Sequence, residues 1–182
     1  MRLFVGIALA PEAVDALLGV RERFGAFGGE LRWPAAESWH VTLQFLGQAD
    51  EAQTVCVQAK LGEVRPARVP VRIGELGFFE RAGVFFAGVA LTPELLALQQ
   101  RVVAATRRCG FVPEDRAYSP HITLARARGR GGARALGPLK KAVERSGFQP
   151  EAEFVAEEFV LYESFPGPEG SRYEVRGRWG LG

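Results

Sequence analysis

The tetrapeptide HVTL at residues 40–43 recurs as HITL at residues 121–124. His40 and His121, which open the two copies, are the only histidines in the 182-residue chain. The copies start almost half the chain length apart, and repetition at such a spacing indicates structurally related halves. The pair therefore predicts a fold of two similar lobes, each of which carries one copy.

Each copy has the pattern of a β-strand. Residues i and i+2 of a strand lie on one face, so His40 shares a face with Thr42, and His121 with Thr123. The apolar residues between and after them point to the opposite face, toward a core. Each strand is therefore expected to present an imidazole and a hydroxyl group together.

Periodicity and turn residues elsewhere predict a mixed α+β chain. Strands are expected at residues 2–8, 31–34, 40–46, 69–79, 83–91, 121–125, 154–162 and 173–179, and helices at residues 11–27, 51–62, 95–109 and 135–146. The strands at 69–79 and 83–91 have the pattern of a hairpin. No linker separates the halves, so we expect residues 1–182 to fold as one bilobal domain.

Two imidazoles and two hydroxyls that converge on one cleft suit the chemistry of a phosphate diester. One neutral imidazole can take a proton from an attacking water while the opposite imidazolium protonates the departing oxygen. The hydroxyls of Thr42 and Thr123 can donate to the phosphate oxygens. A single strand-borne histidine is more often structural, but two matched copies favour catalysis. Two histidines without a carboxylate or thiolate at ligand spacing make a poor zinc site, so we expect no metal and no cofactor.

The residue five positions after each histidine is a further candidate. Arg126 would bind phosphate through its forked guanidinium, although strict alternation places it on the face opposite His121. Phe45 could stack on a base, but the same alternation predicts that it faces the core. Trp33, Trp39 and Tyr118 could also support a base, with core packing as the default expectation for all three.

Composition indicates a soluble protein of the reducing cytoplasm. No run approaches eighteen apolar residues, so no segment is expected to enter a membrane. The first ten residues lack the basic start and the cleavage site of a signal peptide. Cys56 and Cys109 have neither CxxC spacing nor the density of a secreted disulfide scaffold. We therefore expect the chain to fold without disulfide support.

The net charge is only +2, but the charges are unevenly distributed. Residues 126–141 contain basic side chains and no acidic one, whereas residues 151–158 are acidic. The basic members of the first run are Arg126, Arg128, Arg130, Arg134, Lys140 and Lys141. A glycine-rich loop that carries charge for solubility is the simpler interpretation, and a patch for a polyanion is the alternative.

Beyond the motifs, the chain resembles the 2H phosphoesterase superfamily, and within it the LigT-like RNA 2′,3′-cyclic phosphodiesterases, historically called 2′-5′ RNA ligases. The segments that carry the resemblance are MRLFVGIAL at residues 1–9, RW at 32–33, HVTLQFLG at 40–47, YSP followed by HITLAR at 118–126, and FVLYES at 159–164. The match covers nearly the whole chain. One departure is that residues 83–89 read GVFFAGV, where the family has a tryptophan.

The resemblance implies a bilobal α+β fold of two pseudo-symmetric antiparallel sheets with outer helices around a central cleft. It also implies hydrolysis of RNA 2′,3′-cyclic phosphate ends, or of cyclic nucleotides, to 2′-phosphomonoesters without metal or ATP. In that pattern His40 is the acid, His121 activates water, Thr42, Thr123 and Arg126 bind phosphate, and Phe45 lines the nucleotide site.

Three alternatives remain open at this stage. The same site could run the reverse step as a 2′-5′ RNA ligase, or the fold could bind RNA ends without turnover, or it could be purely structural. The physiological RNA, which could be tRNA fragments, is not defined by the sequence, and we expect a monomer.

Overall fold

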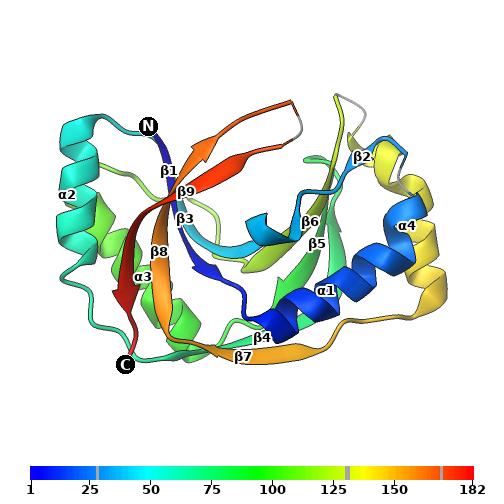
Figure 1. Cartoon of the computed structure of the whole chain (residues 1–182), viewed down its shortest axis with the longest axis horizontal. Helices are drawn as coiled ribbons and strands as arrows, with labels where there is room; N and C mark the ends of the chain where they lie inside the picture. Colours follow the sequence, from blue (N-terminus) through cyan, green and yellow to red (C-terminus); the bar gives the residue numbers. More distant parts are fainter. Residues whose placement is uncertain (28, 130–131, 169) are drawn as a thin grey trace.

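The computed structural model describes residues 1–27, 29–129, 132–168 and 170–182. In these residues the strands form two antiparallel sheets that face each other, and helices cover the outer side of each sheet (Figure 1). The expected α+β fold of two sheets with outer helices is confirmed.

The first sheet contains four strands in the order β3-β1-β8-β9. They span His40–Gln48 (β3), Arg2–Ala8 (β1), Glu158–Phe165 (β8) and Arg172–Gly180 (β9). The inner strand β1 is buried from Leu3 to Ile7, and its Phe4 ring packs against the rings of His40 and Tyr162. This sheet carries the first histidine motif at its β3 edge.

The second sheet contains five strands in the order β2-β6-β5-β4-β7. They span Leu31–Arg32 (β2), His121–Ala127 (β6), Val84–Val89 (β5), Val69–Phe79 (β4) and Ala152–Ala156 (β7). The expected hairpin is the β4–β5 pair. This sheet carries the second histidine motif on β6.

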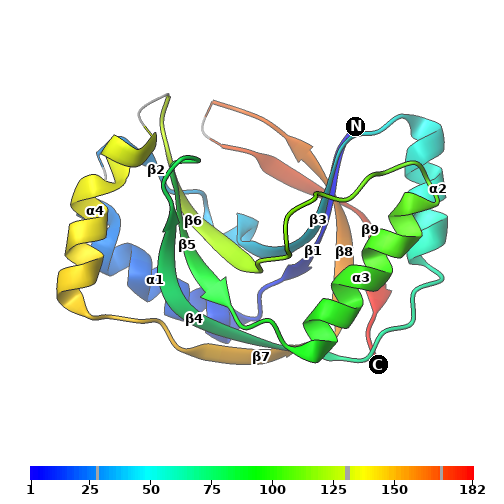
Figure 2. The ribbon, with the colours of Figure 1, turned by 180° about the vertical axis from the view of Figure 1, so that it is seen from behind.

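Two helices cover each sheet (Figures 1 and 2). Helices α2 (Glu51–Leu61) and α3 (Pro93–Arg107) lie outside the first sheet, and α1 (Pro11–Phe24) and α4 (Gly132–Ser146) lie outside the second. Short 3₁₀ turns occupy Gly25–Phe27 and Ala36–Ser38. The Asp50 side chain caps α2 and the Thr92 hydroxyl caps α3, each by accepting from a backbone N–H of the first turn. No helix in the described ranges is both long and apolar enough to span a membrane.

The prediction of a single strand at residues 154–162 is wrong, because this segment contains parts of two strands that belong to different sheets. Strand β7 pairs with β4, the chain passes Glu157, and β8 then pairs with β1 and β9. The apolar run therefore connects the two lobes. Burial shows the break, since Phe154 and Ala156 alternate with exposed residues, whereas Phe159 and the two residues after it are all buried.

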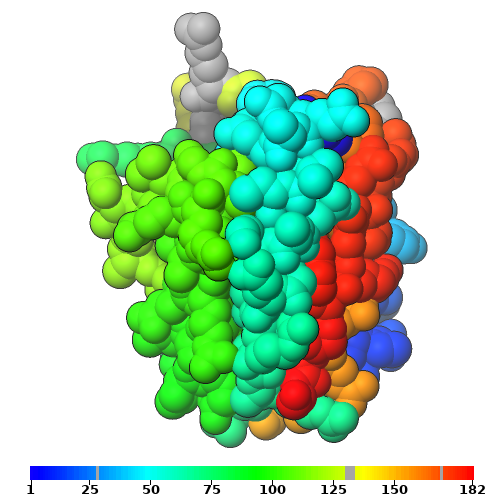
Figure 3. Space-filling view, turned by 90° about the vertical axis from the view of Figure 1, so that its left-hand side faces the viewer, coloured from blue at the N-terminus to red at the C-terminus, as the bar shows by residue number. Residues whose placement is uncertain are grey.

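The expectation of a chain without disulfide support is also wrong. Cys56 on α2 and Cys109, just beyond α3, form a disulfide with their Cα atoms 5.8 Å apart. Figure 3 shows α2 and α3 side by side on this face. The cysteines are 53 residues apart in sequence, so only the packing of the two helices reveals the pairing.

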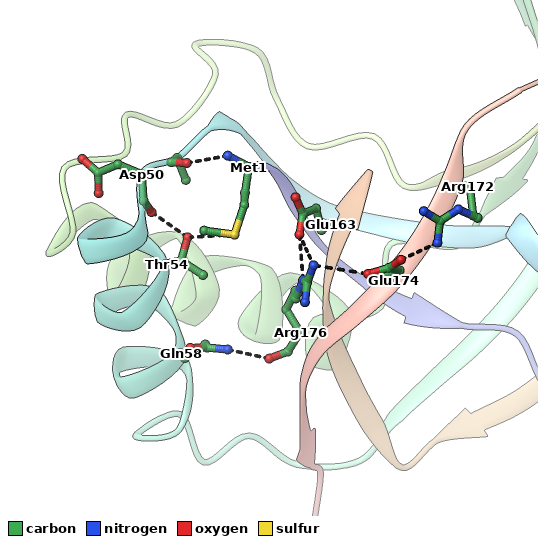
Figure 4. Close-up of polar contacts among 9 residues, drawn as sticks. Met1, Asp50, Thr54, Gln58, Glu163, Arg172, Glu174 and Arg176 are labelled. Carbon is green, nitrogen blue, oxygen red and sulfur yellow. Dashed lines mark hydrogen bonds and ion pairs between the residues drawn. The ribbon is translucent and has the colours of Figure 1, made fainter. Parts of the chain in front are cut away.

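Polar contacts tie α2 to the first sheet (Figure 4). The terminal amino group donates to the Ala49 carbonyl at 2.7 Å, and the Gln58 amide donates to the Arg176 carbonyl at 2.6 Å. Within the sheet, the Arg176 guanidinium pairs with the buried Glu163 carboxylate at 2.7 Å. A buried carboxylate needs such a partner, and the pair joins β8 to β9.

Candidate active site

The two motif strands approach each other between the sheets. Strand β3 contacts β6. Tyr118 lies just before β6, and its hydroxyl donates to the Thr42 carbonyl on β3 at 2.9 Å. His40, Thr42, His121 and Thr123 are all partly exposed, while the motif residues between and after them are buried. The structure thus places both imidazole–hydroxyl pairs on the solvent-facing sides of neighbouring strands.

Both imidazoles are held in the same way. The Nδ1 atom of His40 lies 2.7 Å from the Ser38 carbonyl oxygen, and Nδ1 of His121 lies 2.8 Å from the Ser119 carbonyl oxygen. Since a carbonyl only accepts, each Nδ1 carries the proton, and in the neutral ring Nε2 is left as the acceptor. The Thr42 hydroxyl lies 3.0 Å from Nε2 of His40 and can donate to it. Each Nε2 is thus the basic nitrogen of its ring and is suited to exchange a proton with a substrate.

Burial sets the protonation of this pair. Desolvation lowers the pKa of His40 to about 4, with positive charge on His121 and Arg126 acting in the same direction and the Ser38 carbonyl opposing it. Burial also lowers the pKa of His121, and nearby Arg126 and Arg116 add to this effect. Both imidazoles are therefore neutral in the unliganded site near pH 7. An anion bound between them would favour the charged forms.

A β-bulge in each motif strand decides the position of the fifth residue. Opposite β1, Thr42 pairs with Gly6 and Gln44 with Val5, so Leu43 is the extra residue. Opposite β5, Thr123 pairs with Phe86 and Ala125 with Phe85, which makes Leu124 the extra residue. A bulge shifts the alternation by one position.

Because of the bulges, Phe45 and Arg126 return to the face of the histidines. Phe45 is 55% exposed, so the expectation that it faces the core is wrong. Arg126 is also exposed, and its charge acts on both His40 and His121. The six candidate residues therefore share one surface, with an aromatic ring and a guanidinium at equivalent positions.

Aromatic rings line both sides of this surface, and sequence reasoning missed most of them. Phe4 and Tyr173 lie beside His40, with ring centroids 4.7 and 5.3 Å away. Phe79 and Phe86 lie beside His121 at 4.9 and 5.4 Å. Alternation along β1 places the apolar residues Leu3, Val5 and Ile7 on one face, so Phe4, on the other face, is not marked by that pattern.

Gly6 on β1 is a further residue of the site that sequence reasoning did not identify. A Cβ atom there would lie 2.9 Å from the Val41 carbonyl oxygen and 3.5 Å from Cδ2 of the His40 ring. Only glycine allows this close approach of β1 to the first motif. A glycine within an apolar strand is a signal of such an approach.

The other aromatic candidates belong to the core. Trp39 is buried, Trp33 packs on Phe85, and Tyr118 is partly buried with its hydroxyl on the Thr42 carbonyl. These contacts agree with core packing, the default expectation at the three positions. Among the described residues, no group of three His, Cys, Asp or Glu side chains is arranged to hold a metal ion.

The basic run of residues 126–141 is divided between two elements. Arg126 and Arg128 lie at the end of β6, whereas Arg134, Lys140 and Lys141 lie on α4. Lys140 pairs with Glu80. Arg130 falls outside the described residues.

Comparison with known proteins places the chain in a family. A model of the 2′-5′ RNA ligase superfamily matches residues 20–164. The chain belongs to this superfamily. Within it, an RNA 2′,3′-cyclic phosphodiesterase of Aeropyrum pernix is 30% identical over 138 residues, which are 74% of this chain and 77% of the relative. One from Methanocaldococcus jannaschii is 26% identical over 98% of this chain and all of the relative.

Solved structures share the whole fold of this chain. A structure described as a phosphoesterase superimposes with a TM-score of 0.81 at 25% identity, covering 99% of this chain and 97% of the other. Apo LigT of Escherichia coli gives a TM-score of 0.78 at 25% identity, with 99% and 96% covered. LigT has also been solved with 3′-AMP.

Proposed function

We propose that this protein hydrolyses the 2′,3′-cyclic phosphate at the end of an RNA, leaving a 2′-phosphomonoester and a free 3′-hydroxyl. The observation that carries the proposal is the matched pair of imidazoles, each fixed through Nδ1 by the carbonyl two residues earlier and each beside a threonine on its strand. The family relationship favours turnover over the alternative of binding RNA ends without reaction.

The reaction needs one proton to enter and one to leave. Water attacks phosphorus and gives its proton to Nε2 of His121, while the bond from phosphorus to the 3′ oxygen breaks and that oxygen takes a proton from Nε2 of His40. As the donor, His40 must carry a proton in the complex, although burial lowers its pKa to about 4 in the free site. The phosphate anion, once bound, raises the pKa of both rings and so favours loading of that proton.

The remaining candidates bind the substrate. The hydroxyls of Thr42 and Thr123 donate to the non-bridging phosphate oxygens, where charge builds in the transition state. Arg126 supplies positive charge to the same oxygens, and the exposed ring of Phe45 stacks on the terminal base.

Ligation uses the same groups with a different nucleophile. If the 5′-hydroxyl of a second RNA replaces water, attack on the cyclic phosphate joins the two ends through a 2′-5′ linkage. The superfamily name supports this second activity. Fragments of tRNA that end in a cyclic phosphate are suitable substrates for comparing the two outcomes.

We also propose that residues 1–182 act as one unit, as a monomer in the cytoplasm. Helix α1 directly follows β1 of the first sheet yet covers the second, which supports a single unit. All proposed catalytic residues come from one chain, and RNA ends are made inside cells. Sedimentation of the purified protein tests whether it is a monomer, and fractionation of cells that express it tests whether it is cytoplasmic.

The test of the proposed function is product analysis with a short oligoribonucleotide that ends in a 2′,3′-cyclic phosphate. We expect the wild type to yield the 2′-phosphate with or without EDTA, and His40→Ala or His121→Ala to lower kcat by about 10²- to 10⁴-fold. Lys141→Ala, which removes an exposed charge on α4, is the surface control. Full activity in either histidine variant, or binding of the RNA without any product, would exclude the proposed catalysis.

A further inference from the structure

A cavity adjoins the candidate active site at the C-terminal end of β6. It has a volume of about 360 Å³ and is lined by Arg32, Ala127, Arg128, Gly129 and Pro168. Pro168 belongs to the β8–β9 connection, which lies at the same end of the molecule as β2 and the β6–α4 connection (Figure 1). The cavity therefore lies between the two lobes.

The described lining of the cavity is positively charged. Among the residues that the structure describes, two arginines and no acidic side chain line it. Within the described part of the chain, Arg32, Arg126 and Arg128 take part in no ion pair. Several other arginines of the surface do pair with a carboxylate. The Arg32 guanidinium donates a hydrogen bond to the Pro168 carbonyl oxygen at 3.5 Å. Guanidinium groups gathered in a concave site suit an anion such as a phosphate.

The strand register connects this cavity to the catalytic residues. Arg32 of β2 is the direct partner of Arg126 on β6. Burial is the main cause of the lowered pKa of Arg126, and the positive charge of Arg32 adds to it.

The spacing along β6 matches that of a nucleic acid strand. Arg128 lies two residues beyond Arg126, which corresponds to about 7 Å along an extended chain. That distance is similar to the step between neighbouring phosphates of a nucleic acid strand. In a cyclic-phosphate end, further phosphates exist only on the 5′ side.

We propose that Arg32 and Arg128 form a second phosphate subsite, which binds the phosphodiester on the 5′ side of the terminal nucleotide. The inference rests on the proposed function for the identity of the first site. It makes an RNA end with at least one internal phosphate the preferred substrate, and a cyclic mononucleotide, which lacks that phosphate, a poor one.

The test compares three substrates in the variant Arg32→Ala/Arg128→Ala. For a dinucleotide that ends in a cyclic phosphate, we expect kcat/KM to fall by roughly 10- to 100-fold, because the variant loses one or two charge-assisted hydrogen bonds to the internal phosphate. For the 2′,3′-cyclic mononucleotide we expect a fall of less than about threefold. A dinucleotide with an uncharged methylphosphonate linkage should behave like the mononucleotide. The control Arg107→Ala/Lys141→Ala removes two exposed charges from α3 and α4 and should leave the preference for the dinucleotide unchanged.

Binding separates failure of the subsite from failure of the proposed function. If the wild type turns over neither substrate, the proposed function fails, and calorimetry with 3′-AMP and with a dinucleotide carrying a 3′-phosphate decides the subsite. We expect the double variant to weaken binding of the dinucleotide by roughly 10- to 100-fold and to change that of 3′-AMP by less than about threefold. Equal losses for both ligands, no loss for either, or an equal loss with the methylphosphonate compound would overturn the subsite.

Discussion

At the scale of single residues, the site depends on how each imidazole is held. The carbonyl oxygens of Ser38 and Ser119 fix the protonated nitrogen of His40 and His121, and so leave Nε2 as the basic nitrogen of each ring. The sequence identified both histidines and both threonines from the repeat. It could not give the protonation of the rings, because that depends on burial by residues such as Phe4 and Tyr173 from distant parts of the chain.

The lowered pKa values predict an acidic optimum for kcat/KM. Below both pKa values the two imidazoles are charged and no base is present, and above both values no acid is present. The singly protonated pair is most abundant between the two values, and both lie below 6.5, with that of His40 at about 4. We therefore expect kcat/KM for a cyclic nucleotide to be highest below about pH 6.5 and to fall as the pH rises further.

The kcat profile serves as the internal control for this prediction. Because the bound phosphate anion raises both pKa values, the fall of kcat should occur at higher pH than that of kcat/KM. Steady-state kinetics from about pH 4 to about pH 9 measures both profiles. An optimum of kcat/KM above about pH 6.5 would contradict the lowered pKa values in the free enzyme.

At the scale of elements, the bulges at Leu43 and Leu124 build the site. They explain why strict alternation predicted the wrong face for Phe45 and left Arg126 opposite His121. In β3 the bulge buries Gln44, whose side-chain oxygen accepts a hydrogen bond of 2.7 Å from the Thr106 hydroxyl on α3. Phe45 directly follows this residue, so the contact fixes the strand next to the proposed base site.

Removal of the Thr106 hydroxyl should therefore destabilise the fold and disturb Phe45. In Thr106→Val the buried amide of Gln44, whose Nε2 already lacks a partner among the described residues, loses its oxygen partner too. We expect the free energy of unfolding to fall by about 1–3 kcal/mol, as measured by urea denaturation, and KM for a nucleotide substrate to rise.

Thr106→Ser is the matched control, because it keeps the hydroxyl and removes only a methyl group. It should retain the KM of the wild type. If the valine variant also keeps the wild-type KM and stability, the contact between α3 and β3 does not support the site.

At the scale of the whole molecule, the lobes are interleaved rather than sequential. The chain leaves the first sheet after β1, crosses at Glu157 between β7 and β8, and ends in the first sheet with β9. The helix pair on the outside of the first sheet is further joined by the disulfide between Cys56 and Cys109. This bond lies in the outer layer, on the far side of β3 from the histidine face.

The disulfide should contribute to stability without affecting catalysis directly. Closure of a loop of 53 residues restricts the unfolded chain by about 4 kcal/mol in the chain-entropy description. We expect Cys56→Ala/Cys109→Ala to lower the free energy of unfolding by up to about this amount and to leave kcat/KM near the wild-type value where the protein is folded.

Urea denaturation with and without a thiol reductant measures this contribution. The reductant should destabilise the wild type and leave the double variant unchanged, which makes the variant the control for unrelated effects of the thiol. A wild type that is insensitive to complete reduction would contradict the stabilising role.

The sequence by itself determined the local and repeated features. The two motifs, the amphipathic helices and the β4–β5 hairpin follow from side-chain periodicity and turn chemistry, which act over a few residues and can be read along the chain. The candidate catalytic residues were found in the same way, because His40 and His121 each share a strand face with a threonine.

Tertiary structure decided what depends on partners distant in sequence. The bulges that turn Phe45 and Arg126 into the site arise from pairing with β1 and β5, the break at Glu157 arises from membership of two sheets, and the disulfide arises from the packing of α2 on α3. Each is set by long-range contacts whose energy is absent from any short segment, so no local pattern could predict it.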